Sequence, residues 1–188
     1  FDADGDALSV TNLDTTGMLG TLVLNPVDGS FTYDPRGVFD SLEAGEHVTE
    51  TFTYTANDGF GNSNTTTATL TVTGVNDAPI ATADSFTVNE GSTTILNLAA
   101  NDTDADDGLD LTSITIVSGP ANGSLVVNAD GTVDYTHDGS ETVADSFTYT
   151  IDDLSGATSN TVTVNLTITP VNDAPIATAD SFTVNEGS

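Results

Sequence analysis

VNDAPIATADSFTVNEGS occupies residues 75–92, and the same eighteen letters return without a difference at residues 171–188. The two copies begin 96 residues apart (171 minus 75), so the chain is part of a tandem array of modules of that length. A module that contacts only its neighbours is usually a spacer or a binding unit. The duplication therefore predicts structural modules and not an enzyme, and the sequence offers no constellation of catalytic residues.

Charge is the second informative property of the sequence. The 188 residues include 29 acidic side chains and a single basic one, Arg36, for a formal charge of −28. Self-repulsion of that size weakens the compact state, so counter-ions or bound metal are needed to offset it. The same charge excludes nucleic acid as a partner. No apolar run approaches the ~18 residues of a membrane span, so direct membrane insertion is not expected.

Between the two copies, apolar and polar residues alternate over short stretches that Gly, Asn, Asp and Pro bound, which is typical of strands. Seven strands are predicted, at residues 83–88, 93–99, 111–118, 124–128, 132–136, 146–151 and 160–169. Alternation points Phe147, Tyr149 and Ile151 inward, together with Leu98 and either Ile95 or Leu96. Seven strands separated by turns about every 8 to 12 residues favour an all-β Greek-key sandwich, and a closed barrel is the alternative.

Residues 1–74 repeat this pattern in blocks. The matching blocks are 28–33 with 130–135, 52–55 with 147–150, and 70–73 with 166–169. The offset falls from 102 to 95 between the first two blocks, so residues 34–50 contain seven extra positions, where residues 39–43 are expected to form one helical turn. This copy starts too late to include the first two strands.

Three parts are therefore predicted: residues 1–74, a sandwich that lacks its first strands; residues 75–170, a complete sandwich; and residues 171–188, a linker and the first strand of a next module. We call them repeat 1, repeat 2 and the tail. A sandwich without two strands exposes a sheet edge. Residues 176–184 are accordingly expected to pair with a neighbouring molecule in a crystal.

The order of these motifs resembles a known family. The linker at residues 75–79, the Asp-x-Asp-x-Asp loop at 102–106, the Asp-Gly hairpin at 130–131 and the Phe-Thr-Tyr-Thr strand at 147–150 are similar to the cadherin-like tandem repeats of large bacterial surface adhesins. Residues 39–54 are similar to the VCBS variety of these repeats. The resemblance implies tandem Ig-like or cadherin-like sandwiches in an extracellular protein of the bacterial cell surface. It also implies export by a type I (RTX-type) system, calcium between modules, and a role in adhesion and biofilm formation.

Successive loops of a seven-strand sandwich alternate between its two ends, which brings the acidic loops together. The top of repeat 2, where the incoming linker arrives, is expected to gather Asn76, Asp77, Asp102, Asp104, Asp106, Asp152 and Asp153. The bottom, where the outgoing linker leaves, is expected to gather Glu90, Glu141, Asp145, Asn172 and Asp173. So many oxygen atoms suit Ca²⁺, which takes about 6 to 8 oxygen ligands, better than Mg²⁺.

The prediction is a calcium site that clamps repeats 1 and 2 together and that Glu43, Glu46 or Glu50 completes from repeat 1. The alternative interpretation is that Asp-rich loops are simply solvated turns. The top of repeat 1 contains Asp2, Asp4, Asp6 and Asp58, where a partial site is expected. His47 and His137 are solitary in predicted surface loops, so neither is expected to bind metal or to act in catalysis.

The leading functional hypothesis is a pair of calcium-rigidified extender repeats of an adhesin. The alternative is a module of the adhesin that binds a polysaccharide or a protein. Sugar recognition usually uses exposed aromatic side chains, but the chain has no Trp, and most Phe and Tyr positions alternate as core. We expect a monomer whose partners are the neighbouring repeats of the same chain, with surface glycans or other adhesins bound through other domains.

Overall fold

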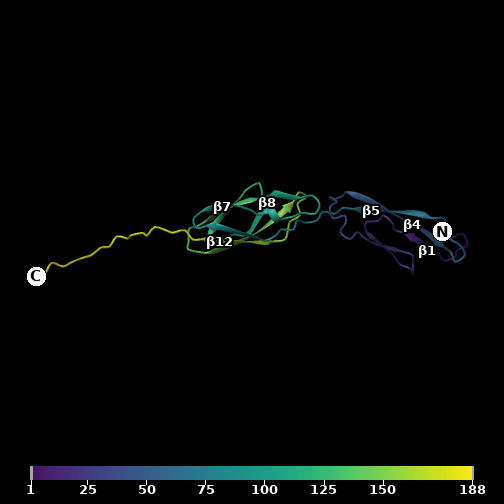
Figure 1. Ribbon diagram of the computed structural model, residues 1–188, viewed down its shortest axis with the longest axis horizontal. Coiled ribbons are helices and arrows are strands. Elements are labelled where there is room, and N and C mark those ends of the chain that lie inside the picture. The colour runs from purple at the N-terminus through teal and green to yellow at the C-terminus, as the bar shows by residue number, and fades with distance from the viewer. Residues whose placement is uncertain (1, 188) are drawn as a thin grey trace.

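The computed structural model describes residues 2–187, leaving out Phe1 of repeat 1 and Ser188 of the tail. Two β-sandwiches follow one another along the long axis of the molecule, and the tail extends from the far end (Figure 1). Repeat 1 contains β1 (Ser9–Asp14), β2 (Thr21–Leu24), β3 (Phe31–Asp34), β4 (His47–Asn57) and β5 (Thr66–Thr73). Repeat 2 contains β6 (Asp84–Asn89), β7 (Thr93–Asn97), the 3-10 turn η1 (Ala99–Asn101), β8 (Leu109–Ser118), β9 (Gly123–Val127), β10 (Thr132–His137), β11 (Ala144–Asp153) and β12 (Val162–Thr169).

Repeat 2 is a sandwich of two sheets, in the orders β6-β12-β11-β8 and β7-β10-β9. Strand β6 runs parallel to β12, and the other pairs are antiparallel. The seven predicted strands are confirmed, with ends that differ by at most two residues. Strand β11 is longer than predicted by two residues at each end, and β7 ends at Asn97 because the chain turns as η1 before the acidic loop.

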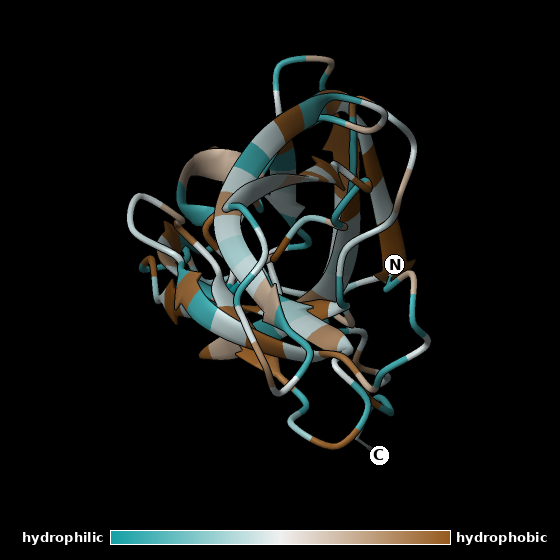
Figure 2. Ribbon diagram, turned by 90° about the vertical axis from the view of Figure 1, so that its right-hand side faces the viewer, coloured by the Kyte–Doolittle hydropathy of each residue, from teal (hydrophilic) through white to brown (hydrophobic). Residues whose placement is uncertain are grey.

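The core of repeat 2 follows the predicted alternation. Phe147, Tyr149 and Ile151 of β11 are fully buried between the sheets. Leu96 and Leu98 are buried as well, whereas Ile95 is exposed, which settles the choice left open in that strand. Figure 2, which looks along the long axis, shows apolar and polar positions alternating along the ribbons. Burial of a side chain such as Phe147 contributes about 2 kcal/mol to folding, so this core is a main source of the stability of repeat 2.

Repeat 1 is the less complete sandwich. Its sheets have the orders β1-β4-β5 and β2-β3, which correspond to β8-β11-β12 and β9-β10 of repeat 2. Residues 2–74 contain no counterpart of β6 or β7. Phe52 is the single buried apolar side chain of these residues, and it packs on Phe31 with ring centroids 4.9 Å apart. The core of repeat 1 is therefore open on the side where two strands are missing.

The tail has no regular structure. Described residues 171–187 form no strand, although their sequence is that of the segment containing β6. Strand β6 forms because β12 lies beside it, whereas the tail has no strand next to it to pair with. Pairing of residues 176–184 with a second molecule stays a prediction. Within the described part of the chain, no helix is long and apolar enough to cross a membrane.

Candidate metal centres

The acidic loop between η1 and β8 folds around one carboxylate. Oδ1 of Asp104 accepts hydrogen bonds from the backbone N–H groups of Asp106 (3.1 Å), Asp107 (2.9 Å) and Gly108 (3.0 Å). Gly108 has a φ of +86°, a conformation that suits glycine, and it turns the chain into β8. The loop therefore bends back on itself, and the second oxygen of Asp104 remains available for another partner.

Asp153, the last residue of β11, brings the incoming linker to this loop. Its side chain is only 2% exposed. Oδ1 accepts a hydrogen bond from the N–H of Ala157 (2.8 Å), and Oδ2 accepts one from Nδ2 of Asn76 (2.8 Å). The N–H of Asp77 donates to Oδ2 of Asp106 (3.3 Å). The linker is thus held against both acidic loops of repeat 2.

We define the top cluster as Asn76, Asp77, Asp104, Asp106, Asp107 and Asp153. Carboxylate oxygens of Asp104, Asp107 and Asp153 lie within 4.8 Å of one another. Among residues 2–187, the buried side-chain oxygen and nitrogen atoms that lack a hydrogen-bond partner are Asn76 Oδ1, Asp104 Oδ2, Asp106 Oδ1 and both carboxylate oxygens of Asp107. All five are oxygens of this cluster. A buried oxygen without a hydrogen-bond donor destabilises the fold, and a hard divalent cation takes such oxygens as ligands. The five oxygens of this cluster therefore fit a metal ion.

The carboxylates of the top cluster differ in their electrostatics. Burial opposes ionisation of Asp104, but its three backbone N–H donors outweigh this effect and lower its pKa. Burial raises the pKa of Asp106, and the neighbouring carboxylates of Asp104 and Asp107 raise it further. Repulsion between the acids is therefore present in the protein alone, and a bound cation would relieve it.

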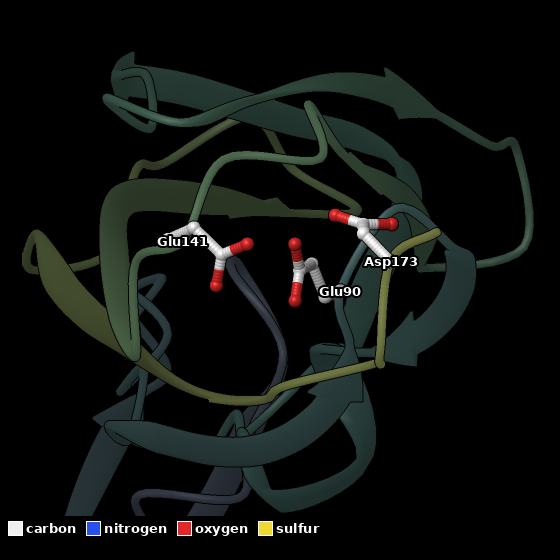
Figure 3. Close-up of side chains that lie close together, drawn as sticks. All are labelled: Glu90, Glu141 and Asp173. Atoms are coloured by element: carbon white, nitrogen blue, oxygen red, sulfur yellow. The ribbon is translucent and has the colours of Figure 1, made fainter. Parts of the chain in front are cut away.

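A second group, the bottom cluster, lies at the other end of repeat 2 and consists of Glu90, Glu141 and Asp173. Their carboxylate oxygens lie within 4.8 Å of one another, and Figure 3 shows the three side chains facing a common space. Glu90 is buried, and its Oε2 accepts a hydrogen bond from the N–H of Val171 (3.0 Å). The bottom cluster therefore joins the turn after β6 to the outgoing linker.

Asp102, predicted to share the top site, lies elsewhere. Its carboxylate is buried and accepts hydrogen bonds from the N–H of Thr82 (2.8 Å) and the hydroxyl of Tyr149 (2.9 Å). Oδ2 of Asp84 accepts a longer hydrogen bond, 3.3 Å, from the same Tyr149 hydroxyl. Burial, together with the nearby charge of Asp102, raises the pKa of Asp84 to about 6. The structure thus assigns Asp102 to a buried pair of carboxylates beneath the loop.

Two further differences concern neighbouring residues. Asp152 is outside the top cluster because consecutive residues of β11 point to opposite faces, and Asp153 takes the inner one. Asp107 belongs to the cluster although it was not a predicted ligand. The alternate spacing of Asp102, Asp104 and Asp106 predicted three ligands from one loop, whereas the loop folds around Asp104 and brings Asp107 inward. The Gly after Asp107 was the available signal for that turn.

Repeat 1 has a reduced version of the top cluster. Oδ1 of Asp2 accepts hydrogen bonds from the N–H groups of Asp4 (2.9 Å), Gly5 (2.9 Å) and Asp6 (3.1 Å), which reproduces the loop at Asp104. Asp58 corresponds to Asp153 and accepts N–H groups of its own loop. Gly5 stands where repeat 2 has Asp107, so one carboxylate of the set is missing.

The residues expected to complete the junction from repeat 1 are arranged differently. Glu50 is buried inside repeat 1, where it accepts hydrogen bonds from the N–H of Leu19 and the hydroxyl of Tyr33. It is therefore unavailable to the junction. Oε2 of Glu46 accepts the N–H of Glu43 (3.3 Å), which stabilises the turn beside the linker.

Asp40 is the repeat 1 acid that reaches the junction. It lines a pocket of about 340 Å³ together with Asp77, Ala78, Ile80, Thr103, Asp104 and Ala105.

His137 corrects another expectation, because it is buried at the end of β10 and not in a surface loop. Its Nδ1 accepts hydrogen bonds from the N–H groups of Gly91 (3.2 Å) and Gly139 (3.1 Å). The ring proton is then on Nε2, which donates to Thr142 Oγ1 (3.1 Å). His137 thus holds two turns together near the bottom cluster.

Comparison with known proteins assigns this architecture to a family. A sequence profile of the bacterial cadherin-like domain matches residues 1–74 and again residues 76–170. The chain belongs to the bacterial cadherin-like domain family. Cadherin-like domains are not catalytic modules. A search of curated proteins found no match.

A solved cadherin structure shares this fold. A fragment of Drosophila N-cadherin, EC1-4, is 16% identical with a TM-score of 0.52, over 88% of this chain and 42% of that chain. An endo-fucoidan hydrolase of glycoside hydrolase family 107 is 19% identical with a TM-score of 0.37, over 90% and 24%. The chain therefore spans less than half of the N-cadherin fragment and about a quarter of the hydrolase. At these identities the N-cadherin likeness shows the fold alone, and the hydrolase carries no argument.

Proposed function

We propose that the chain consists of calcium-rigidified extender modules of a large bacterial cell-surface adhesin of the type I-secreted, VCBS-containing kind. The observation that carries the calcium assignment is the set of five buried, unpartnered oxygens in the top cluster. Six side chains would hold Ca²⁺ there: Asn76, Asp77, Asp104, Asp106, Asp107 and Asp153. Calcium suits the set because it accepts many oxygens in irregular geometry.

The duplicated linker supports a junction that engages modules on both sides. In each copy the Asn side chain donates to the carbonyl oxygen of the following Asp at 3.2 Å, Asn76 to Asp77 and Asn172 to Asp173. The carboxylate of Asp173 lies in the bottom cluster of the module before its linker. The N–H of Asp77 donates to Asp106, which belongs to the module after its linker. One linker of this sequence can therefore contact the bottom cluster of one module and the top cluster of the next.

Between repeats 1 and 2 the preceding module would contribute Asp40, which lines the junction pocket beside Asp77. Asp58 and the loop around Asp2 would form a weaker site at the top of repeat 1. Asp102 and Asp152 are not part of this proposal, because the carboxylate of Asp102 bonds Thr82 and Tyr149 and the side chain of Asp152 lies on the face of β11 opposite Asp153.

Rigidity follows from charge. The formal charge is −28, so without a cation the acids on the two sides of each linker repel and the junction bends. With Ca²⁺ bound, the same acids share one ion, and the folded modules are stabilised by linkage. A stiff, extended array holds an adhesive tip away from a cell surface, which is the role we assign to these repeats in extracellular adhesion and biofilm formation.

The alternative of a glycan-binding module receives less support. Phe60 and Phe182 are strongly exposed aromatic side chains. Phe60 follows β4 in repeat 1, whereas Phe182 belongs to the tail beyond repeat 2, so the two are far apart (Figure 1). They do not form one platform on which a sugar ring could stack.

The test is a calcium titration of the full chain followed by calorimetry and small-angle X-ray scattering. We expect binding in the top cluster, a higher melting temperature and a narrower distribution of inter-module angles. Asp153→Asn should weaken binding, while the hairpin variant Asp130→Asn, whose carboxylate bonds Thr132 and belongs to neither cluster, should not. Identical scattering and melting in Ca²⁺ and in chelator would refute the proposal.

A further inference from the structure

Strands β6 and β12 are the first and the last strands of repeat 2, and they lie side by side in one sheet. They pair in parallel over six residues, from Asp84 opposite Val164 to Asn89 opposite Thr169. Five strands separate them in the sequence, yet no strand lies between them in the sheet. The two ends of the module are therefore joined directly to each other by a ladder of backbone hydrogen bonds.

A side chain lengthens this ladder at the end nearest the top cluster. Asn160, two residues before β12, accepts the N–H of Ala81 at Oδ1 (3.1 Å) and donates from Nδ2 to the carbonyl oxygen of Ala81 (2.9 Å). The amide thus bonds Ala81 as a backbone peptide group would, with one donor and one acceptor. Ala81 is buried, so water has little access to these two bonds.

Glu90 lengthens the ladder at the opposite end, next to the bottom cluster. Its N–H donates to the carbonyl oxygen of Thr169 (3.0 Å), and its Oε2 accepts the N–H of Val171 (3.0 Å). Glu90 is buried as well. The bonded contact between the first and the last segment therefore extends from Ala81 to Glu90 on one side and from Asn160 to Val171 on the other.

Tension along a tandem array loads this ladder in shear. The incoming linker reaches repeat 2 at the end that faces repeat 1, and the following chain leaves at the opposite end (Figure 1). A pull on the linker draws β6 toward repeat 1, while a pull on the following chain draws β12 the other way. Because the two strands are parallel, these pulls slide one strand along the other. The bonds of a parallel pair are evenly spaced, so all of them are strained together.

The other contacts of the linker do not share the load in this way. Asn76 bonds Asp153, and Ile80 forms a single bridge with Thr103. These contacts follow one another along the linker, so tension breaks them singly. Strands β7 to β11 lie between β6 and β12 in the sequence, so a load that passes directly from β6 to β12 bypasses them. Tension therefore meets its main resistance at the ladder.

We infer that the ladder between β6 and β12, with Asn160 and Glu90 at its two ends, is the force-bearing clamp of repeat 2. That tension acts on the array rests on the proposed extender function, but the clamp itself needs no bound ion. Val88 of β6 and Leu166 of β12 belong to the core, which covers one face of the ladder. A module built in this way transmits a load from linker to linker while β7 to β11 carry little of it.

Single-molecule force spectroscopy of the full chain in chelator tests the clamp in two pulling geometries. In the first, the chain is tethered by its two termini, which loads the ladder in shear. Repeat 2 is identified by the length that it releases, up to about 300 Å for residues 81–171, whereas the shorter repeat 1 releases less.

In the second geometry, the chain is tethered through Asn89→Cys and its C-terminus, which is possible because the sequence has no other cysteine. Asn89 and Thr169 lie opposite each other at the same end of the ladder, so the pairs now open one by one. Unfolding under force is governed by the unfolding barrier, so we expect a several-fold lower force than in shear at the same pulling rate. The side chain of Asn89 is exposed, so the substitution should leave the melting temperature unchanged.

Asn160→Ala separates a mechanical role of this side chain from a merely structural one. The variant loses both bonds to Ala81 and should unfold at a lower force in shear. It should keep its force in the second geometry, because the ladder then opens from the other end. Asn165→Ala is the matched control, since this side chain is exposed on the outer face of β12, and it should change neither force.

Equal forces in the two geometries would overturn the inference, and so would an equal loss of force in Asn160→Ala and Asn165→Ala. If Asn160→Ala does not fold, the comparison of the two geometries still decides. Every measurement is made in chelator, so a weak ladder would leave the calcium assignment standing. Conversely, a chain that binds no calcium but resists shear would keep the clamp and lose the proposed function.

Discussion

The side chain of Asn76 donates a hydrogen bond from Nδ2 to Oδ2 of Asp153 over 2.8 Å, although 77 residues separate the two in the sequence. This bond attaches the linker to the end of β11 and leaves Oδ1 of Asn76 buried without a partner. Asn is suited to this position because the amide offers one donor to a carboxylate and one oxygen to a cation. The same side chain therefore belongs to the fold and to the proposed calcium site.

Asn76→Asp separates these two roles. The substitution removes the donor and adds a charge beside Asp153, so repeat 2 should lose about 2 kcal/mol of unfolding free energy in chelator. Saturating Ca²⁺ should restore most of the loss, because the new carboxylate still offers oxygen ligands. Urea denaturation with and without Ca²⁺ measures both. The control is Asn172→Asp, since Asn172 makes the same local bond but has no side-chain carboxylate partner among the described residues. An equal loss in both variants would contradict the assignment.

Asp107→Asn should have effects of opposite sign with and without calcium. Both oxygens of Asp107 are buried and unpartnered, and they lie near Asp104 and Asp153. Removing this charge relieves repulsion, so the variant should melt at a higher temperature than the unchanged chain in chelator. In Ca²⁺ it should melt lower, because a ligand is weakened. Asp110→Asn, at a half-buried position outside the cluster, serves as the control for removing a hydrogen-bonded carboxylate. A variant that melts lower in both conditions would mean that Asp107 is a structural residue.

Tyr135→Phe tests a hydrogen bond that both repeats share. The hydroxyl of Tyr135 donates to Oδ2 of Asp145 (2.9 Å), and Tyr33 makes the equivalent bond to Glu50. Burial and the bond to Asp145 raise the pKa of Tyr135, so the hydroxyl stays protonated and remains a donor. Its removal should cost about 1 to 2 kcal/mol of unfolding free energy, because Asp145 keeps its backbone donors but loses the tyrosine. Denaturant unfolding measures the difference, and a neutral substitution would show that water replaces the hydroxyl.

Asp84→Asn should change how stability depends on pH. The pKa of Asp84 is raised from 3.8 to about 6, so the folded protein binds this proton more tightly than the unfolded chain. The stabilisation is fully present below pH 3.8 and is lost as pH rises through about 6. Asn stays neutral, so the variant should be more stable than the unchanged chain at pH 7, by at most about 3 kcal/mol.

Urea denaturation in chelator at several pH values between about 2 and 7 measures this effect. Asp110→Asn is the control of opposite sign. Hydrogen bonds from the hydroxyl and the N–H of Thr112 lower the pKa of Asp110, so its stabilisation is present above the unfolded pKa and is lost as pH falls through the folded value. The same pH profile in Asp84→Asn and in the unchanged chain would contradict the shifted pKa.

The sequence by itself determined the fold and the repeat. The alternation of Phe147, Tyr149 and Ile151 identifies an inward face because successive side chains of a strand point to opposite sides. The pair Asp130-Gly131 marks a hairpin because Gly131 adopts a φ of +81° at no steric cost. Such signals are local, so one sequence suffices to read them, and the two copies of residues 75–92 locate the linkers directly.

The tertiary structure alone decided which acids meet. Asp102 and Asp107 look equivalent in the sequence, but the bend around Asp104 turns Asp107 into the top cluster and leaves Asp102 beneath it, bonded to Tyr149. Likewise the sequence alone makes Glu50 a plausible junction ligand. In the fold its carboxylate is buried inside repeat 1, where it accepts a hydrogen bond from Tyr33. The physical reason is that a carboxylate's partners are set by contacts between distant segments. The sequence shows how many oxygens are present, and the folding of the loops decides where they point.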